Sequence, residues 1–160
     1  MMMLRRAVLF LTLLTVALLA GRAFWAWVAD NPANFSPATY VAYVQGVDRA
    51  IELPIAAMGI GAVLLTGISA ALSFRDRPVF CVLFVALVCV LASNVVTVVV
   101  HLPINRQLAS FNPAALPANW PELRDRWWEF HMVRLVTLLA GMVLVSLAAV
   151  MRTQPRNICS

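Results

Sequence analysis

The sequence contains no lysine, and charged residues make up only 12% of its 160 positions. A soluble domain usually carries about twice that share of charge. Hydrophobic residues make up 62%, and the mean hydropathy is +0.87. Such a chain cannot cover its folded surface with polar groups. The composition therefore excludes an ordinary soluble domain and indicates an integral membrane protein.

Several motifs that carry chemistry are also missing. There is no dinucleotide fingerprint, no phosphate-binding P-loop and no CxxCH haem-attachment motif. The three cysteines, Cys81, Cys89 and Cys159, form no CxxC or Cys/His pattern, so no structural zinc site is expected. The arginines flank apolar runs instead of clustering among aromatics on a polar face. We therefore expect no nucleic-acid partner.

Four apolar runs are long enough to cross a bilayer, at residues 7–28, 53–72, 79–100 and 132–151. The third run is rich in valine, but a lone segment in lipid satisfies its backbone only as a helix. We predict an all-α fold, an integral membrane four-helix bundle that forms a single domain over residues 1–160. The proline-rich segment 102–121 is predicted to form a structured outer loop between the third and fourth helices.

Local signals refine these helices. Ser36 and Pro37 are typical of a helix start, and Pro54 is expected to kink the helix that follows. Pairs of small residues four positions apart predict close approach of a neighbouring helix. These pairs are Ala57/Gly61 and Gly67/Ala71. For the first apolar run, a signal peptide cleaved near residue 21 remains an alternative, although apolar character continuing to residue 28 favours a retained helix.

Arginine placement predicts the orientation. On one side of the membrane six arginines face one acidic residue, and on the other six arginines face six acidic residues. The positive-inside rule then puts both termini in the cytoplasm. The first side holds Arg5, Arg6, Arg75, Arg77, Arg152 and Arg156 with Asp76. We expect a multi-pass protein of the bacterial inner membrane with the lipid bilayer as its partner, and the oligomeric state stays open.

The stretch from residue 101 to residue 134 contains both histidines and three of the five tryptophans. Several charges lie within or beside the predicted spans, where an unpaired charge is costly. We therefore predict that the four helices converge on one polar cluster near the outer membrane face. Within it, Arg134 is expected to pair with Glu52 or Asp48.

Two motifs in this stretch carry a family resemblance: PINR at residues 103–106 and LRDRWWEFHMVR at residues 123–134. With them the chain resembles the anthrone-oxygenase-like four-helix membrane proteins, formerly catalogued as a domain of unknown function. The resemblance implies a small membrane bundle. It associates the fungal members with oxidation of anthrones to anthraquinones in polyketide pathways, while most bacterial relatives have no assigned activity.

Together, the residues and the resemblance favour an oxygenase or oxidoreductase that acts on a flat, anthrone-like aromatic with oxygen. His131 is predicted to be the base, because imidazole titrates near neutral pH. Arg134 and Asn105 are predicted to stabilise the oxyanion that develops. The residues predicted to bind substrate are Trp127, Arg106, Asn94, His101 and Glu52. No cofactor is predicted, because removing the acidic methylene proton yields an anion that can react with oxygen directly.

Other interpretations remain open. The chain is alternatively a non-enzymatic binding or accessory module of the membrane. In a further alternative, His101 and His131 ligate haem or a metal ion, because two histidines on neighbouring helices allow it. The charged residues can also form a purely structural ion network, and the tryptophans an interfacial belt.

Overall fold

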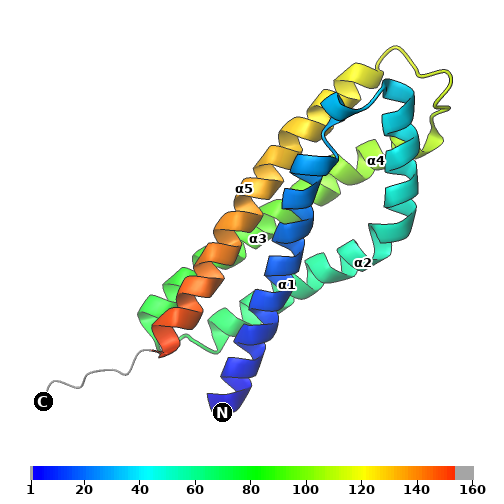
Figure 1. Cartoon of the computed structure of the whole chain (residues 1–160). Coiled ribbons are helices and arrows are strands. Elements are labelled where there is room, and N and C mark those ends of the chain that lie inside the picture. The colour runs from blue at the N-terminus through cyan, green and yellow to red at the C-terminus, as the bar shows by residue number, and fades with distance from the viewer. Residues whose placement is uncertain (1, 154–160) are drawn as a thin grey trace, which may run out of the picture.

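The computed structural model describes residues 2–153 and is all-α over that range. Its helices run side by side in an elongated bundle (Figure 1). The helices are α1 (Met2–Ala29), a short 3-10 turn (Pro32–Asn34), α2 (Pro37–Ala71), α3 (Arg77–Val96), α4 (Leu102–Ser110) and α5 (Trp120–Thr153). Within the described residues, four helical stretches are long and apolar enough to span a membrane. The predicted four-helix membrane fold is confirmed.

The second helix begins where the sequence predicts. Ser36 has an extended backbone, and its side chain accepts a hydrogen bond from the Thr39 backbone N–H. Pro37 follows in the first turn, where its missing N–H leaves no bond unmade. Pro54 lies inside this helix, and Figure 1 shows α2 sharply bent in its middle part.

The segment after the third span differs from the prediction. We expected a loop at residues 102–121, but α3 continues through a π turn (Thr97–His101) directly into α4. Pro103 lies in the first turn of α4, and the wider π turn before it accommodates the proline ring without ending the helix. The Leu102 backbone N–H reaches back to the Thr97 carbonyl, which closes this wider turn. The irregular outer connection shrinks to residues 111–119.

Close helix approach occurs at glycines other than those predicted. A Cβ added at Gly59 on α2 would lie 2.5 Å from the Asn94 side-chain oxygen, and one at Gly141 on α5 would lie 3.2 Å from a Val90 methyl. At Gly61 and Gly67 an added Cβ would meet nothing within 4 Å. The small-residue pairs were therefore assigned to the wrong positions, because spacing alone does not reveal which face of α2 meets α3.

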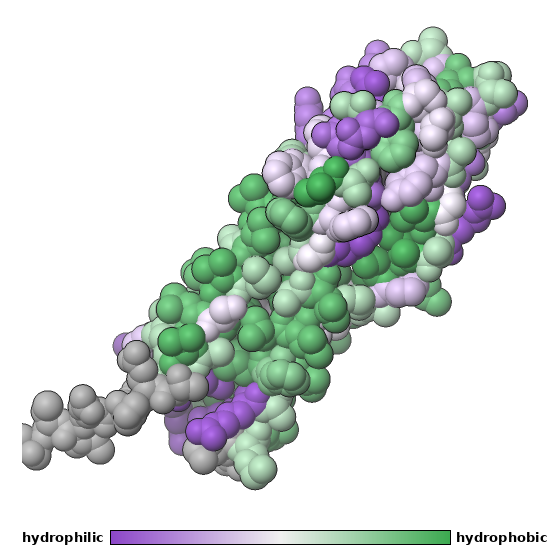
Figure 2. All heavy atoms as spheres, viewed as in Figure 1, coloured by the Kyte–Doolittle hydropathy of each residue, from purple (hydrophilic) through white to green (hydrophobic). Residues whose placement is uncertain are grey.

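The surface has the character that lipid requires. Figure 2 shows a broad hydrophobic band along the middle of the bundle, with hydrophilic residues gathered at the two ends. Many large apolar side chains in this band are more than half exposed, among them Ile60, Val98 and Val136. A soluble protein would not expose so much contiguous apolar surface. The chain is a multi-pass integral membrane protein.

Candidate functional site

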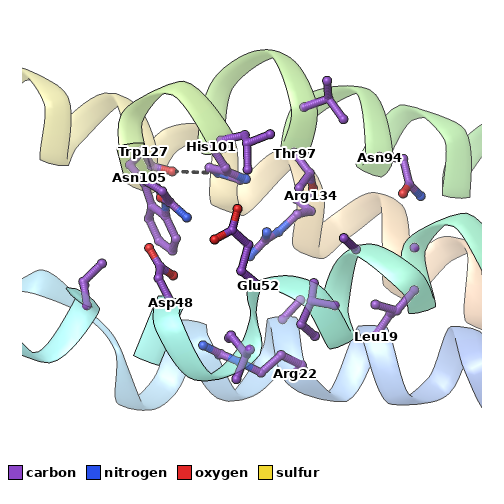
Figure 3. Close-up of a pocket in the computed structure, with 18 of the residues that line it drawn as sticks. Leu19, Arg22, Asp48, Glu52, Asn94, Thr97, His101, Asn105, Trp127 and Arg134 are labelled. Atoms are coloured by element: carbon purple, nitrogen blue, oxygen red, sulfur yellow. Dashed lines mark hydrogen bonds between the residues drawn. The ribbon is translucent and has the colours of Figure 1, made fainter. Parts of the chain in front are cut away.

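A cavity of about 380 Å³ lies between the helices, towards the end of the bundle that carries α4. Its walls come from α1, α2, α3, the π turn, α4 and α5. The volume lies in the lower part of the range usual for small-molecule pockets. Polar side chains project into it from several helices (Figure 3). The polar residues and Trp127 in its wall are Arg22, Gln45, Asp48, Arg49, Glu52, Ser93, Asn94, Thr97, His101, Asn105, Arg106, Trp127 and Arg134.

Arg134 is held by His131, one turn before it on α5. The guanidinium Nη2 lies 3.0 Å from His131 Nδ1. An arginine can only donate, so Nδ1 accepts and Nε2 carries the ring proton. That Nε2–H donates to the Ala23 backbone carbonyl of α1 at 3.1 Å. His131 therefore links α1 to Arg134 with both nitrogens occupied.

This arrangement does not support the predicted role of His131 as the base. The side chain is fully buried, and it is absent from the cavity wall. Neither ring nitrogen has a free lone pair for a substrate proton. The ring instead stacks on Trp127, with centroids 5.1 Å apart and an interplanar angle of 10°, and contacts Trp128 at 5.6 Å. His131 positions Arg134 and Trp127 from behind the cavity wall.

His101 differs from His131 in having one unoccupied nitrogen. Its Nε2 lies 3.2 Å from the Trp127 backbone carbonyl. A carbonyl only accepts, so Nε2 is the donor and Nδ1 carries a lone pair. Nδ1 is buried and has no hydrogen-bond partner among the described residues. Buried polar atoms normally have a partner, so this unpaired nitrogen of a cavity-wall residue is a candidate functional group.

Asn105 is oriented by Trp127. The indole Nε1–H donates to Asn105 Oδ1 at 2.9 Å. Because the oxygen is fixed in this bond, the amide nitrogen keeps both of its N–H donors for a ligand. Arg134 lies near the same indole, with its guanidinium carbon 5.9 Å from the ring centroid. The cavity wall thus brings an amide donor and a guanidinium to the same aromatic ring.

The charged residues do not pair as the sequence predicted. Within residues 2–153, side-chain salt bridges shorter than 4.0 Å join Arg22 to Asp30 at 2.9 Å and Arg124 to Asp125 at 2.7 Å. Asp30 is buried and also accepts a hydrogen bond from the Tyr43 hydroxyl at 2.7 Å. The expected pairing of Arg134 with Glu52 or Asp48 was wrong, because His131 supplies the partner instead.

Of the predicted site residues, all but His131 contribute to the cavity wall. The structure brings together Asn105, Arg134, Trp127, Arg106, Asn94, His101 and Glu52. Among cavity residues that the site prediction left out, Gly59 and Gln45 are instructive. Gly59 stood out as a glycine inside an apolar span, and Gln45 as an amide in the polar first turns of α2. Both residues stand out in the sequence, but the sequence does not show that they lie on the face of α2 that borders the cavity.

The two histidines are neighbours, with ring centroids 6.3 Å apart. Among the described residues, no group of three or more His, Cys, Asp or Glu side chains is placed to hold a metal ion. Ligation by both histidines would also require His131 to release either Arg134 or the Ala23 carbonyl.

The fold and the cavity define a four-helix integral membrane protein with a partly polar pocket near one end of the bundle. The chain belongs to the anthrone oxygenase family, whose model matches residues 48–144. The match covers most of α2, all of α3 and α4, and most of α5, including Asn105, His131 and Arg134. Neither a search of curated proteins nor one of solved structures finds a match.

Proposed function

We propose that the protein is an oxygenase that oxidises a flat aromatic with an acidic methylene group, an anthrone-like substrate, in the cavity between its helices. The observation that carries the proposal is one shared wall. His101 belongs to that wall and has a buried nitrogen without a partner among the described residues, while Asn105 and Arg134 offer hydrogen-bond donors beside the Trp127 ring. Membership of the anthrone oxygenase family supports the same chemistry.

In the proposed reaction, His101 Nδ1 removes one proton from the methylene carbon. The substrate carbonyl becomes an oxyanion, to which Asn105 and Arg134 donate hydrogen bonds. The resonance-stabilised carbanion transfers electrons to oxygen, and a C–O bond forms to give a hydroperoxide that recovers the proton from His101. Loss of the second methylene proton then breaks the O–O bond. One oxygen atom remains as the new carbonyl, and the other leaves as water.

The aromatic residues have a binding role in this proposal. A planar substrate can stack or pack edge-on against Trp127, whose orientation is fixed by its bonds to Asn105 and its stack on His131. Holding the substrate in one orientation is itself a large part of catalysis. His131 acts as a positioning residue in this account, since it holds both Arg134 and the Trp127 ring.

Oxygen uptake by the purified protein with anthrone tests the proposal, after subtraction of the protein-free oxidation rate. His101→Gln keeps a donor for the Trp127 carbonyl but removes the lone pair of the imidazole. We expect it to lower kcat by at least about 100-fold, the usual contribution of a general base, with KM changed little. Thr15→Val, at an exposed hydroxyl of α1 that bonds only the Leu11 carbonyl, is the control and should behave as the wild type.

Two results would overturn the proposal in different ways. Full activity in His101→Gln together with inactivity in Glu52→Gln would move the base to the carboxylate that α2 contributes to the same cavity. A Soret band or stoichiometric metal in the active wild-type protein would replace the direct reaction with oxygen by cofactor chemistry. An absorption spectrum and metal analysis of the same sample separate these cases.

A further inference from the structure

We call the continuous helix formed by α3, the π turn and α4 the α3–α4 rod. The second helix packs against this rod near its own start and again from Gly59 onwards, and it bows away between these two regions. Near its start, Gln45 Nε2 donates to the carbonyls of Leu108 and Phe111, at 2.8 and 2.9 Å. Further along, Gly59 lies so close to Asn94 that no Cβ would fit there without displacing the amide. Gly59 follows Gln45 by 14 positions, which corresponds to about 21 Å of helix. Pro54 lies within this part of α2, which stands apart from the α3–α4 rod in Figure 1.

The cavity reaches the surface along this bowed part. On the α2 side its wall includes Ala56 and Ile60, both exposed, and on the opposite side it includes Val98, also exposed. By contrast, the wall residues Ala23 of α1 and Leu138 of α5 are buried. The open side of the cavity therefore lies between α2 and the α3–α4 rod.

The rim of this opening is apolar at Ala56, Ile60 and Val98, and it is charged towards the α4 end, where the cavity residues Arg49, Glu52 and Arg106 are also exposed. Ile60 is 62% exposed and Val98 is 63% exposed, and both belong to helical stretches apolar enough to cross the bilayer. Exposed aliphatic side chains at this position face hydrocarbon. Arg134 and His101 lie behind the apolar part of the rim, in the wall contributed by α5 and the π turn.

From these contacts we infer that the opening between α2 and the α3–α4 rod is a lateral portal, through which a lipid-dissolved aromatic passes from the bilayer into the cavity. The inference rests on the proposed function for the class of ligand. Beyond the proposed function, the portal specifies the route of entry and requires that the ligand be an apolar molecule that concentrates in the membrane. A flat aromatic would enter between the aliphatic side chains of Ala56 and Val98 and meet Arg134 and His101 behind them.

Ligand-binding kinetics in lipid vesicles test the portal independently of catalysis. The probe is anthraquinone, which lacks the reactive methylene, and stopped-flow quenching of tryptophan fluorescence reports its binding. A Trp127→Phe variant identifies the part of the signal that comes from the cavity wall. Ala56→Phe and Val98→Phe narrow the portal from opposite sides, and Val133→Phe, at an exposed residue of α5 outside the cavity wall, is the matched control.

A portal controls the rate of passage and not the final affinity. We expect both narrowing variants to slow association and dissociation by about tenfold each, as when binding must await an opening motion, with Kd within twofold of the wild type. Val133→Phe should leave both rates unchanged. Wild-type rates in both narrowing variants would overturn the portal. Faster dissociation with a weaker Kd would also overturn it, because Ala56 and Val98 would then contact the bound ligand instead of lining its route.

Failure of the portal and failure of the proposed function give different results. If anthraquinone binds the narrowing variants at the wild-type rate while anthrone is still oxidised, the portal is wrong and the oxygenase stands. If the narrowing variants show the slow, affinity-neutral kinetics but no anthrone oxidation occurs, the portal stands and the oxygenase is wrong. Absence of any anthraquinone binding to the wild-type protein would overturn both.

Discussion

The hydrogen bond between His131 and Arg134 should be a measurable source of stability. Replacing His131 with phenylalanine keeps a ring that can stack on Trp127 but removes the acceptor for Arg134 and the donor for the Ala23 carbonyl. A bond to a charged group contributes about 1.5–3 kcal/mol and a neutral one about 1 kcal/mol, so the variant should lose about 2.5–4 kcal/mol. Reversible unfolding in mixed micelles, followed by circular dichroism during SDS titration, gives this free energy.

A double-mutant cycle isolates the bond from other effects of each change. Arg134→Met removes the charge while keeping an unbranched apolar stem. Because it also relieves the desolvation of a buried guanidinium, its single effect can have either sign. The coupling energy with His131→Phe should nevertheless be about 1.5–3 kcal/mol. The same cycle with Glu52→Gln should give less than about 1 kcal/mol, because no salt bridge joins Glu52 to Arg134.

Additivity of the His131 and Arg134 changes within about 0.5 kcal/mol would refute this account of the bond. A coupling larger for Glu52 than for His131 would restore the ion pair that the sequence predicted. Both cycles use the same Arg134→Met protein, so they share one reference and differ only in the partner.

Further predictions concern topology and packing. In a cysteine-free background, a cysteine introduced at Ser110 should react with an impermeant thiol reagent added outside intact cells. A cysteine introduced at Arg75 should not react, and the reverse pattern would invert the proposed orientation. Gly59→Ala should destabilise the bundle by about 1 kcal/mol, because the new Cβ displaces the Asn94 side chain from its bond to the Val90 carbonyl. Gly61→Ala, which meets nothing, should be neutral or stabilising by up to about 1 kcal/mol; equal losses at the two glycines would contradict this packing.

The fold was predictable from the sequence because lipid leaves few choices. An isolated apolar run in a bilayer must be helical, so hydropathy alone located the four membrane helices. The helix from Leu102 to Ser110 was missed because Pro103 was interpreted, together with the later prolines of residues 102–121, as a sign of a loop. That inference assumes a regular α-helix before the proline. The π turn at residues 97–101 changes the local geometry, and the valine-rich sequence carries no clear signal for it.

The membership of the site was easier to predict than the role of each residue. His131 and Arg134 are three positions apart on one helix, so their contact follows from helical geometry. The partner of the second His131 nitrogen is the carbonyl of Ala23, 108 positions earlier in the chain. Only the packing of α1 against α5 creates that contact. It is this contact that occupies His131 fully and leaves His101 as the histidine with a free nitrogen.

The cavity exists because the end of one helix needs hydrogen bonds that another helix supplies. At the end of α4 the Leu108 carbonyl accepts a hydrogen bond from the backbone N–H of Phe111, the residue that follows the helix. Gln45 donates to the carbonyls of Leu108 and Phe111 there, which ties the start of α2 to the end of α4. Gly59 fixes α2 to α3 further along, and the bend near Pro54 lies between these two contacts. Loss of the Gln45 side chain should therefore let α2 move toward α3 and close the cavity. The loss of its two hydrogen bonds should lower the free energy of unfolding by about 1–3 kcal/mol. Gln45→Leu tests this directly: anthraquinone binding should weaken, and unchanged binding would show that the bend alone keeps the cavity open.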